Sequence, residues 1–317
     1  MVAEQRVESS RHRCVALVGP TASGKSALSL DVAQELGVDI LCCDSVQVYR
    51  GLDIGSAKPT PADRAHIPHH LLDLVEPNET FTAMDYCNAA EPLVRASSRL
   101  LVGGTGLYLR SVALTTTRVP GDRPPGDPVR TAFEGRWTGA ESRTEGAIHR
   151  ELSARDPVTA AEIHPRNAVR GLRALWLCEC AGEPVSAVRA RHPPQARMDL
   201  FIVVLDPGVD PVDARIERRC EAMFRDGLVQ EVVALRAQGF DSASTAMKSL
   251  GYRQVSEHLD GRSTLADARK SIVAETRAYA RRQRTFFRHR LPPAAEVCWI
   301  DRAEAFPVEQ ARRFLRG

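Results

Sequence analysis

Lysine is scarce in this chain of 317 residues, with four lysines against 39 arginines. Aromatic residues make up 5% of the sequence, and the longest apolar run, near residue 200, has about six residues. A membrane-spanning helix needs about 20 apolar residues, and residues 1–13 are too polar for a signal peptide. The eight cysteines form no C-x-x-C pair, and no histidines are paired at metal-ligand spacing. We therefore expect a cytoplasmic globular protein with reduced thiols.

Positive charge is unevenly distributed along the chain. The net charge is +3, but residues 1–116 carry 10 basic and 13 acidic side chains, and the remainder carries 33 basic and 27 acidic ones. The excess is compatible with a polyanionic partner, although such a balance is also common in enzymes without one. With 43% hydrophobic residues, the chain can bury a full core, and we expect one large domain with a smaller one. No heptad pattern or apolar stripe indicates a dimer, so a monomer is expected.

A phosphate-binding motif lies near the N-terminus. Residues 19–26 read Gly-Pro-Thr-Ala-Ser-Gly-Lys-Ser and match G-x-x-x-x-G-K-[ST], between an apolar run at 14–18 and a helix-like stretch at 27–36. In such a loop the backbone N–H groups point at phosphate, Lys25 supplies a positive charge and the Ser26 hydroxyl can bind Mg²⁺. The sequence therefore predicts that the chain binds a di- or triphosphate.

Four short apolar runs predict buried parallel strands, at residues 14–18, 39–43, 99–102 and 201–205. The neighbours Cys42 and Cys43 should point to opposite faces of one of these strands. Each run is followed by a turn or helix signal. We predict an α/β fold with a P-loop NTPase-like parallel sheet and helices on both faces.

Proline-rich connections indicate a small, mainly helical insertion domain at residues 117–198, between core segments 1–116 and 199–317. Prolines and glycines should interrupt regular structure over 114–146, before a helical segment at 148–176 and a second proline-containing loop at 192–194. After the last strand, helices are expected at 210–225 and 229–237, separated at Gly227. A longer helix should start at Thr264 and end near His289.

Asp44 ends the second predicted strand. Ligands of open parallel sheets bind beyond the carboxyl ends of the strands, so Asp44 should face the phosphate loop and is a candidate general base, or else a helix cap. The strand at 99–102 is followed by Gly-Gly-Thr-Gly, with no acidic residue where a Walker B aspartate would stand. Conventional nucleotide hydrolysis is therefore disfavoured.

A basic segment near the C-terminus has two interpretations. Residues 269–290 contain eight Lys or Arg side chains and one acid, Glu275. Such a run is often only a solvated face. The interleaved Tyr279, Phe286 and Phe287 favour instead a surface that binds single-stranded nucleic acid.

Five ordered motifs together resemble the tRNA dimethylallyltransferase family. They are G-P-T-A-S-G-K-S (19–26), D-S-V-Q-V-Y-R-G-L-D-I-G-S-A-K-P (44–59), H-H-L-L-D (69–73), L-V-G-G-T-G-L-Y (101–108) and G-Y-R-Q (251–254). The resemblance implies transfer of a dimethylallyl group from dimethylallyl diphosphate to N6 of the adenosine 3′ of the anticodon. It also implies Mg²⁺ as cofactor and the tRNA anticodon stem-loop as partner.

The resemblance also assigns site residues. Asp44 would act as base, with Lys25, Thr21 and Arg215 as further catalytic residues. The diphosphate would be bound by Gly19, Thr21, Ala22, Ser23, Gly24, Lys25, Ser26 and Arg215. The tRNA would be contacted by Asp44, Ser45, Val46, Gln47, Thr105, Arg130, Val169, Arg170, Gly171, Leu172, Arg173, Ser249, Leu250, Gly251, Tyr252, Arg253 and Gln254.

Three other functions stay open at this point. A P-loop kinase for a small molecule could also use Asp44, but would give the C-terminal helices no task. An adenylate isopentenyltransferase would perform the same chemistry on a free nucleotide, and the basic C-terminal region argues for tRNA instead. An RNA-binding module without catalysis would not need Lys25 and Ser26 in an intact phosphate loop.

Overall fold

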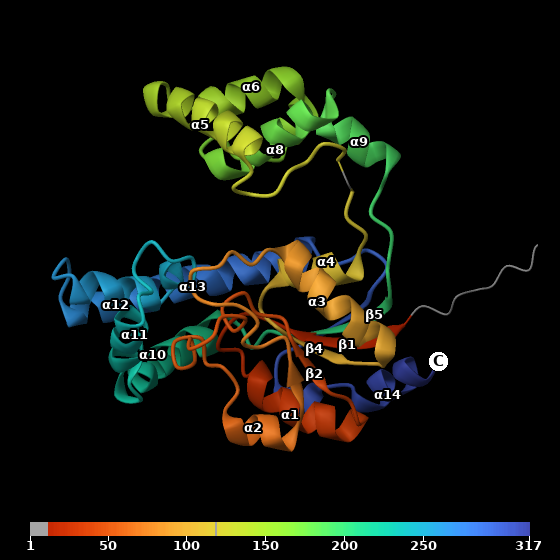
Figure 1. The fold of residues 1–317 in the computed structure, drawn as a ribbon. Helices are drawn as coiled ribbons and strands as arrows, with labels where there is room; N and C mark the ends of the chain where they lie inside the picture. The colour runs from red at the N-terminus through yellow and green to blue at the C-terminus, as the bar shows by residue number, and fades with distance from the viewer. Residues whose placement is uncertain (1–11, 118) are drawn as a thin grey trace, which may run out of the picture. The chain divides into compact units, whose positions relative to one another are not determined.

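The computed structural model describes residues 12–117 and 119–317 (Figure 1). The expectation of a polar N-terminal segment without a signal peptide falls almost wholly on residues 1–11, outside the described residues. Six parallel strands form one sheet in the order β3-β2-β4-β1-β5-β6. They are β1 (Arg13–Val18), β2 (Ile40–Cys42), β3 (His69–His70), β4 (Leu100–Gly103), β5 (Asp199–Leu205) and β6 (Glu296–Ile300).

Helices cover both faces of this sheet, as predicted. Helices α1 (Lys25–Leu36), α2 (Pro61–His66) and α14 (Val308–Arg316) lie on one side in Figure 1, and α3 (Ala83–Ala96), α4 (Gly106–Ala113) and α13 (Leu265–His289) lie on the other. Side chains of β1 alternate between the two layers: Ala16 packs with the α3 side and Leu17 with the α1 side. Cys43 and Cys42 divide in the same way, which confirms that prediction.

The helices after β5 begin and end close to the expected residues. Helix α10 spans Val209–Arg225 and α11 spans Leu228–Ala237, with Gly227 between them at φ 107°, a backbone angle that favours glycine. Helix α12 (Tyr252–Leu259) and a 3-10 turn (Ala246–Lys248) precede α13. Thr264 caps α13 by accepting a hydrogen bond from the Asp267 N–H.

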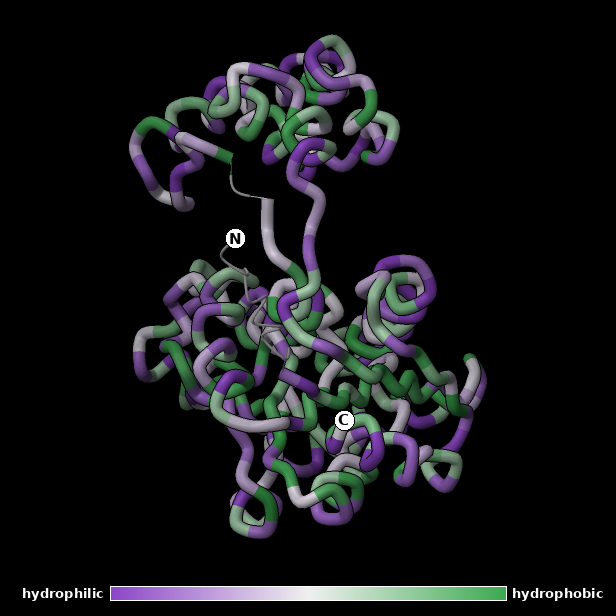
Figure 2. Tube along the Cα trace, turned by 90° about the vertical axis from the view of Figure 1, so that its right-hand side faces the viewer, coloured by the Kyte–Doolittle hydropathy of each residue, from purple (hydrophilic) through white to green (hydrophobic). Residues whose placement is uncertain are grey.

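Residues 115–195 form a second compact unit with its own core. Its helices are α5 (Pro128–Arg143), α6 (Ala147–Arg155), α7 (Pro157–Ala161), α8 (Ala168–Ala181) and α9 (Val185–Arg191). Figure 2 shows hydrophobic stretches in both units, as expected if each has a core. Among the described residues the first unit comprises 12–114 and 196–317, so the boundaries lie two or three residues from the expected ones. At this junction Leu114 and Ala196 form an isolated antiparallel bridge.

One expectation for this unit was wrong, and a second was less detailed than the structure. Residues 114–146 are not without regular structure, because α5 occupies half of them: Pro128 takes the first helical position, where its missing N–H costs nothing, and Asp127 caps the helix. The helical segment expected at 148–176 is three helices. Asp156 and Pro157 end α6 and begin α7, and Asn167 caps α8 by accepting a bond from the Arg170 N–H at 3.2 Å.

Candidate active site

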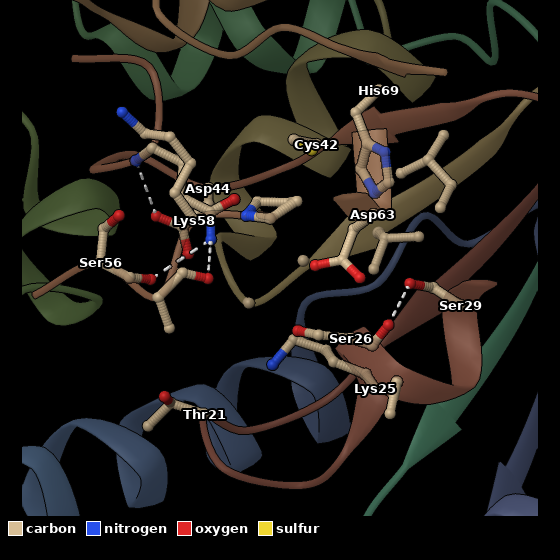
Figure 3. Close-up of a pocket in the computed structure, with 18 of the residues that line it drawn as sticks. Thr21, Lys25, Ser26, Ser29, Cys42, Asp44, Ser56, Lys58, Asp63 and His69 are labelled. Carbon is tan, nitrogen blue, oxygen red and sulfur yellow. Dashed lines mark hydrogen bonds between the residues drawn. The ribbon is translucent and has the colours of Figure 1, made fainter. Parts of the chain in front are cut away.

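A cavity of about 360 Å³ lies at the carboxyl edge of the sheet in the first unit (Figure 3). The phosphate loop and α1 form one wall, and the segment after β2 with residues 56–59 forms another. Gly103 at the end of β4, Gly104 after it, and side chains from α10 and α13 complete it. The cavity thus lies where ligands of open parallel sheets bind, beyond the ends of β1, β2 and β4.

The phosphate loop is shaped by tight backbone packing. A Cβ atom at Gly19 would lie 2.3 Å from the Leu205 carbonyl oxygen of β5, so only glycine fits there. Ala22 has φ 61° and Gly24 has φ 102°, which turn the chain into the first turn of α1. The Ser23 side chain is buried. Gly19, Ala22, Ser23 and Gly24 therefore build the loop, while its remaining predicted residues, Thr21, Lys25 and Ser26, line the cavity.

Lys25 is held in the cavity wall with a lowered proton affinity. Its ammonium donates a hydrogen bond to the Pro20 carbonyl oxygen at 3.0 Å. Burial lowers the pKa of Lys25 from 10.5 to about 8, the Asp44 carboxylate acts in the opposite direction and the Arg219 guanidinium lowers the pKa further. An anion entering the cavity would add negative charge beside this ammonium and favour its protonated form.

Asp44 faces the same cavity from the segment that follows β2 (Figure 3). Its Oδ1 atom accepts hydrogen bonds from the Val46 N–H at 2.8 Å and the Gln47 N–H at 3.4 Å, which fixes the turn. Both interpretations of Asp44 are therefore compatible with the geometry: Oδ1 caps a turn, and Oδ2 is the oxygen not used by that turn. Thr105 supports this segment by accepting a hydrogen bond from the Ser45 N–H at 3.1 Å.

Two arginines of α10 reach the phosphate loop. Arg215 donates to the Ser23 carbonyl oxygen at 2.6 Å, and so braces the loop without lining the cavity. Arg219 does line the cavity, and donates to the Thr21 hydroxyl at 3.0 Å and to the Ser56 carbonyl at 3.4 Å. Burial lowers the pKa of Arg219. The sequence resemblance assigned the diphosphate role to Arg215, with the nearby Arg218 and Arg219 leaving that register open. In the structure Arg219 lines the cavity, one helical turn from Arg215 on the same helix face.

Helix α13 forms a wall of the cavity through Gln283 and Tyr279. The Gln283 side chain accepts from the Thr21 N–H at 2.8 Å and donates to the Gly104 carbonyl at 2.9 Å, and thereby ties the phosphate loop to the end of β4. Burial, followed by the nearby Asp44 charge, raises the pKa of Tyr279 to about 12, so it stays a neutral hydroxyl. The Gln283 role was not predicted, because it depends on how α13 packs.

Models of two protein families match the chain: that of the IPP transferases over residues 47–290, and that of the isopentenyl transferases over residues 12–73. The chain is 39% identical to the tRNA dimethylallyltransferase of Geobacter metallireducens, over 93% of this chain and 94% of the relative. It is 41% identical to tRNA dimethylallyltransferase 1 of Citrifermentans bemidjiense, over 87% and 89%.

The chain belongs to the IPP transferase family. Solved structures agree: the full-length tRNA isopentenylpyrophosphate transferase of Bacillus halodurans is 31% identical, covers 97% of this chain and 96% of its own, and has a TM-score of 0.64. A eukaryotic dimethylallyltransferase described as acting on tRNA has a TM-score of 0.76 at 21% identity, over 95% of this chain and 77% of its own, and shows the shared fold.

The basic run of α13 is less available to a ligand of this IPP transferase than its sequence suggested. Arg284 makes a two-pronged ion pair with Asp206 at 2.5 and 2.6 Å, and both side chains are about nine-tenths buried. Arg277 and Arg281 pair with acids of α10. Phe287 is 1% exposed and belongs to the core, so the expectation that it stacks on bases was wrong.

The G-Y-R-Q segment, with Ser249 and Leu250 before it, was expected to contact tRNA. Tyr252 and Gln254 are 0% and 1% exposed and so support the fold of this segment, whose contact with tRNA stays a prediction. Gln254 accepts from the Gly251 N–H at 2.9 Å and thereby caps α12. Arg253 pairs with Glu257 and Glu275 at the edge of the same region.

The remaining candidates for contact with tRNA lie in the second unit. Arg130 is paired with Glu134 at 2.6 Å and its side chain is 12% exposed. In the run 169–173, Val169 is 81% exposed, whereas Gly171 is buried. Arg173 forms an ion pair with Asp122 at 2.5 Å. Contact between these residues and tRNA stays a prediction.

The described parts of the chain contain no helix long and apolar enough to cross a membrane. Nor do the described residues contain a group of three or more His, Cys, Asp or Glu side chains that could hold a metal ion by themselves.

Proposed function

We propose that the chain transfers a dimethylallyl group from dimethylallyl diphosphate to N6 of the adenosine 3′ of the anticodon in tRNA, with release of diphosphate. The observation that carries this proposal is that Asp44 and Lys25 line one cavity. A base for the amine and a cation for the leaving group are thereby available to the same bound pair of substrates. The relatives named above are tRNA dimethylallyltransferases, which supports the same reaction.

The phosphate loop would stabilise the leaving group. Breaking the allylic C–O bond leaves its electron pair on diphosphate, so positive groups must be in place before the charge develops. Lys25 and Arg219 line the cavity and would supply those charges, and Arg215 would hold the loop in shape through the Ser23 carbonyl. Thr21 accepts a hydrogen bond from Arg219, which leaves its own hydroxyl proton to donate to a diphosphate oxygen.

Asp44 would act on the acceptor. The adenine amine is a weak nucleophile because its lone pair is delocalised into the ring. As the new C–N bond forms, the amine must lose a proton, and Asp44 Oδ2 is the acceptor we assign. General-base assistance of this kind contributes about 10²–10⁴ in rate. An enclosed cavity also protects a developing allylic cation from water.

A magnesium ion fits the oxygen groups present. Mg²⁺ prefers oxygen ligands and is commonly bound through one or two protein groups together with substrate phosphates. Ser26 lines the cavity, and we assign its hydroxyl oxygen, together with oxygens of the bound diphosphate, as the group that would hold the ion. Bound there, the ion would neutralise diphosphate charge.

Binding of tRNA would use arginines outside the cavity. Exposed arginines of α13 such as Arg282 and Arg288, with Arg170 in the second unit, are the candidates. A base of the anticodon loop is already single-stranded, so its extrusion into the cavity costs at most a few kcal/mol. Arginine contacts to phosphates release counterions, so tRNA affinity should fall steeply as salt rises.

One assay tests this proposal against its alternatives. The protein is incubated with Mg²⁺, dimethylallyl diphosphate and unmodified tRNA, and the nucleosides are analysed by mass. Parallel reactions contain AMP in place of tRNA, or ATP with candidate metabolites. We expect prenylated adenosine only in the reaction that contains tRNA. Prenylated AMP without tRNA product would indicate an adenylate isopentenyltransferase, and rapid formation of ADP a kinase.

A further inference from the structure

Glu231, on α11, contacts the loop that carries part of the cavity wall. Its carboxylate accepts hydrogen bonds from three successive backbone N–H groups, those of Asp53 at 3.1 Å, Ile54 at 2.7 Å and Gly55 at 3.2 Å. It also accepts from the Tyr252 hydroxyl at 2.6 Å. Four donors on one carboxylate fix both the loop and the acid, since hydrogen bonds to a charged group are the stronger kind.

The same loop continues into groups that face the cavity. Ser56 follows directly, and its carbonyl accepts from Arg219 at 3.4 Å and from the Gln47 amide at 3.3 Å. Lys58 is buried two residues later, where its ammonium donates to the Tyr49 carbonyl at 2.8 Å. The position of the Ser56 carbonyl therefore helps to set the direction of the Arg219 guanidinium.

Tyr252 packs against this loop with no space to spare. A Cβ atom at Gly55 would lie 2.6 Å from the Tyr252 ring, so the ring lies directly on the backbone of the loop. Burial, followed by the Glu231 charge, raises the pKa of Tyr252, which keeps its hydroxyl a donor. The tyrosine of the G-Y-R-Q motif thus has a contact that its sequence alone did not indicate.

We propose that Glu231 and Tyr252 are positioning residues for diphosphate: together they hold residues 53–55, and through the carbonyl of the next residue, Ser56, they aim Arg219 at the phosphate loop. The inference rests on the proposed function, because it assumes that Arg219 binds the donor's diphosphate. It gives Tyr252 a role that does not depend on RNA, since its contacts are with the Glu231 carboxylate and the backbone of Gly55.

The test measures binding of Mg²⁺-pyrophosphate by calorimetry in the absence of tRNA. Tyr252→Phe keeps the ring and removes only the hydroxyl. Glu231→Gln replaces one carboxylate oxygen by an NH₂ group, which then faces two of the four donors. We expect the dissociation constant to rise about fivefold in the first and about twentyfold in the second, from the usual worth of hydrogen bonds to a charged group. Affinity for unmodified tRNA should stay within about twofold, because phosphate contacts by exposed arginines are unchanged.

The control is Val232→Ala, which removes buried methyl groups from the same helix without touching these hydrogen bonds. It should lower thermal stability but leave pyrophosphate affinity unchanged. Equal weakening of pyrophosphate binding in Val232→Ala would show a merely structural role and overturn the inference. Unchanged pyrophosphate affinity in Tyr252→Phe and Glu231→Gln, with or without loss of tRNA affinity, would overturn it as well. Failure of the unsubstituted chain to bind pyrophosphate would instead overturn the proposed function together with the inference.

Discussion

The ammonium of Lys25 and the carboxylate of Asp44 share one cavity, and each affects the chemistry available to the other. Burial leaves Lys25 with a pKa of about 8, despite the opposing effect of Asp44. A bound diphosphate would add negative charge beside the ammonium and favour its protonated form. Proton binding and donor binding should therefore be linked at this residue.

Donor binding should depend on pH with a definite sign. Below pH 8 Lys25 is already protonated in the free protein. Its affinity for pyrophosphate is therefore high, and Lys25 takes up no proton on binding. As pH rises through about 8, the free protein loses that proton, and binding must restore it, so affinity should fall. Calorimetry in buffers of different ionisation heat should detect proton uptake near pH 8 that is absent in Lys25→Arg, because arginine stays charged. Identical proton uptake in both proteins would assign the titration to another group.

Substitution of Asp44 by asparagine separates its two roles. Asparagine caps turns as well as aspartate does, so Asp44→Asn should keep the turn made by the Val46 and Gln47 N–H groups. It cannot accept the amine proton, and single-turnover prenylation should fall about 10²–10⁴-fold. Affinity for tRNA should be unchanged. Near-normal turnover in Asp44→Asn would remove it as the base.

At this scale the sequence predicted the residues that belong to contiguous motifs. The place of Lys25, Ser26 and Asp44 in the cavity could be predicted because each follows from a short stretch of sequence. The first two belong to the phosphate loop, and Asp44 follows the end of a strand. The sequence did not predict that Arg219, Gln283 and Tyr279 line the cavity. Their place there depends on the packing of α10 and α13 against a loop about 200 residues or more earlier in the chain. Arg219 carried one local signal, its four-residue spacing from Arg215.

At the scale of elements, the short glycine-rich turn after β4 is where α13 meets the sheet. A Cβ atom at Gly104 would lie 2.2 Å from the Gln283 amide nitrogen, and one at Gly106 would lie 2.2 Å from the Phe286 ring. Gln283 and Phe286 are separated by three residues and so lie on neighbouring parts of one helix face. The glycines of L-V-G-G-T-G thus allow a helix to approach the end of β4 closely.

Gly106→Ala should accordingly destabilise the first unit. The methyl group would displace the Phe286 ring and with it α13, at a cost of about 1–3 kcal/mol. Gly135→Ala is the matched control: Gly135 lies inside α5 and nothing lies within 4 Å of its added methyl group, so alanine should stabilise that helix by about 1 kcal/mol. Denaturant unfolding measures both. If Gly106→Ala had the same free energy of unfolding as the unsubstituted chain, α13 could move away from the added methyl group without loss of stability.

Which strands could be predicted follows from their burial. The four central strands β1, β2, β4 and β5 are short apolar runs covered on both faces, and each was found. The edge strands were missed: β3 is two histidines, and β6 is half exposed and begins with Glu296. Helix α5 was missed because prolines argue against helices everywhere except in the first turn.

At the scale of the whole molecule, the chain leaves and re-enters the first unit at one place. Leu114 and Ala196 pair in an antiparallel bridge, and within the second unit the Thr115 N–H donates to the Gln195 carbonyl at 2.8 Å. The second unit has its own core around residues such as Leu152 and Leu175, both 0% exposed. Each unit therefore has the internal packing of an independent folding unit.

Removal of the second unit should separate donor binding from RNA binding. Replacing residues 115–195 by a short Gly-Ser linker joins two ends that already lie side by side. The shortened protein should unfold cooperatively and bind Mg²⁺-pyrophosphate within about threefold of the full chain, since every residue lining the cavity is retained. Its affinity for tRNA should fall at least about tenfold if residues such as Arg170 contact the RNA. Undiminished tRNA binding would confine the RNA site to the first unit.

The order of strands in the sheet has a consequence for synthesis on the ribosome. Strand β1 lies between β4 and β5, but β5 follows the entire second unit in the chain. When residues 1–114 have emerged, β1 still has one unpaired edge and the phosphate loop lacks the helices that brace it. The second unit can complete its own core first, because all its residues precede Asp199. The nascent chain therefore carries an open-edged half sheet until translation has passed β5, and this interval is when a chaperone would have most to protect.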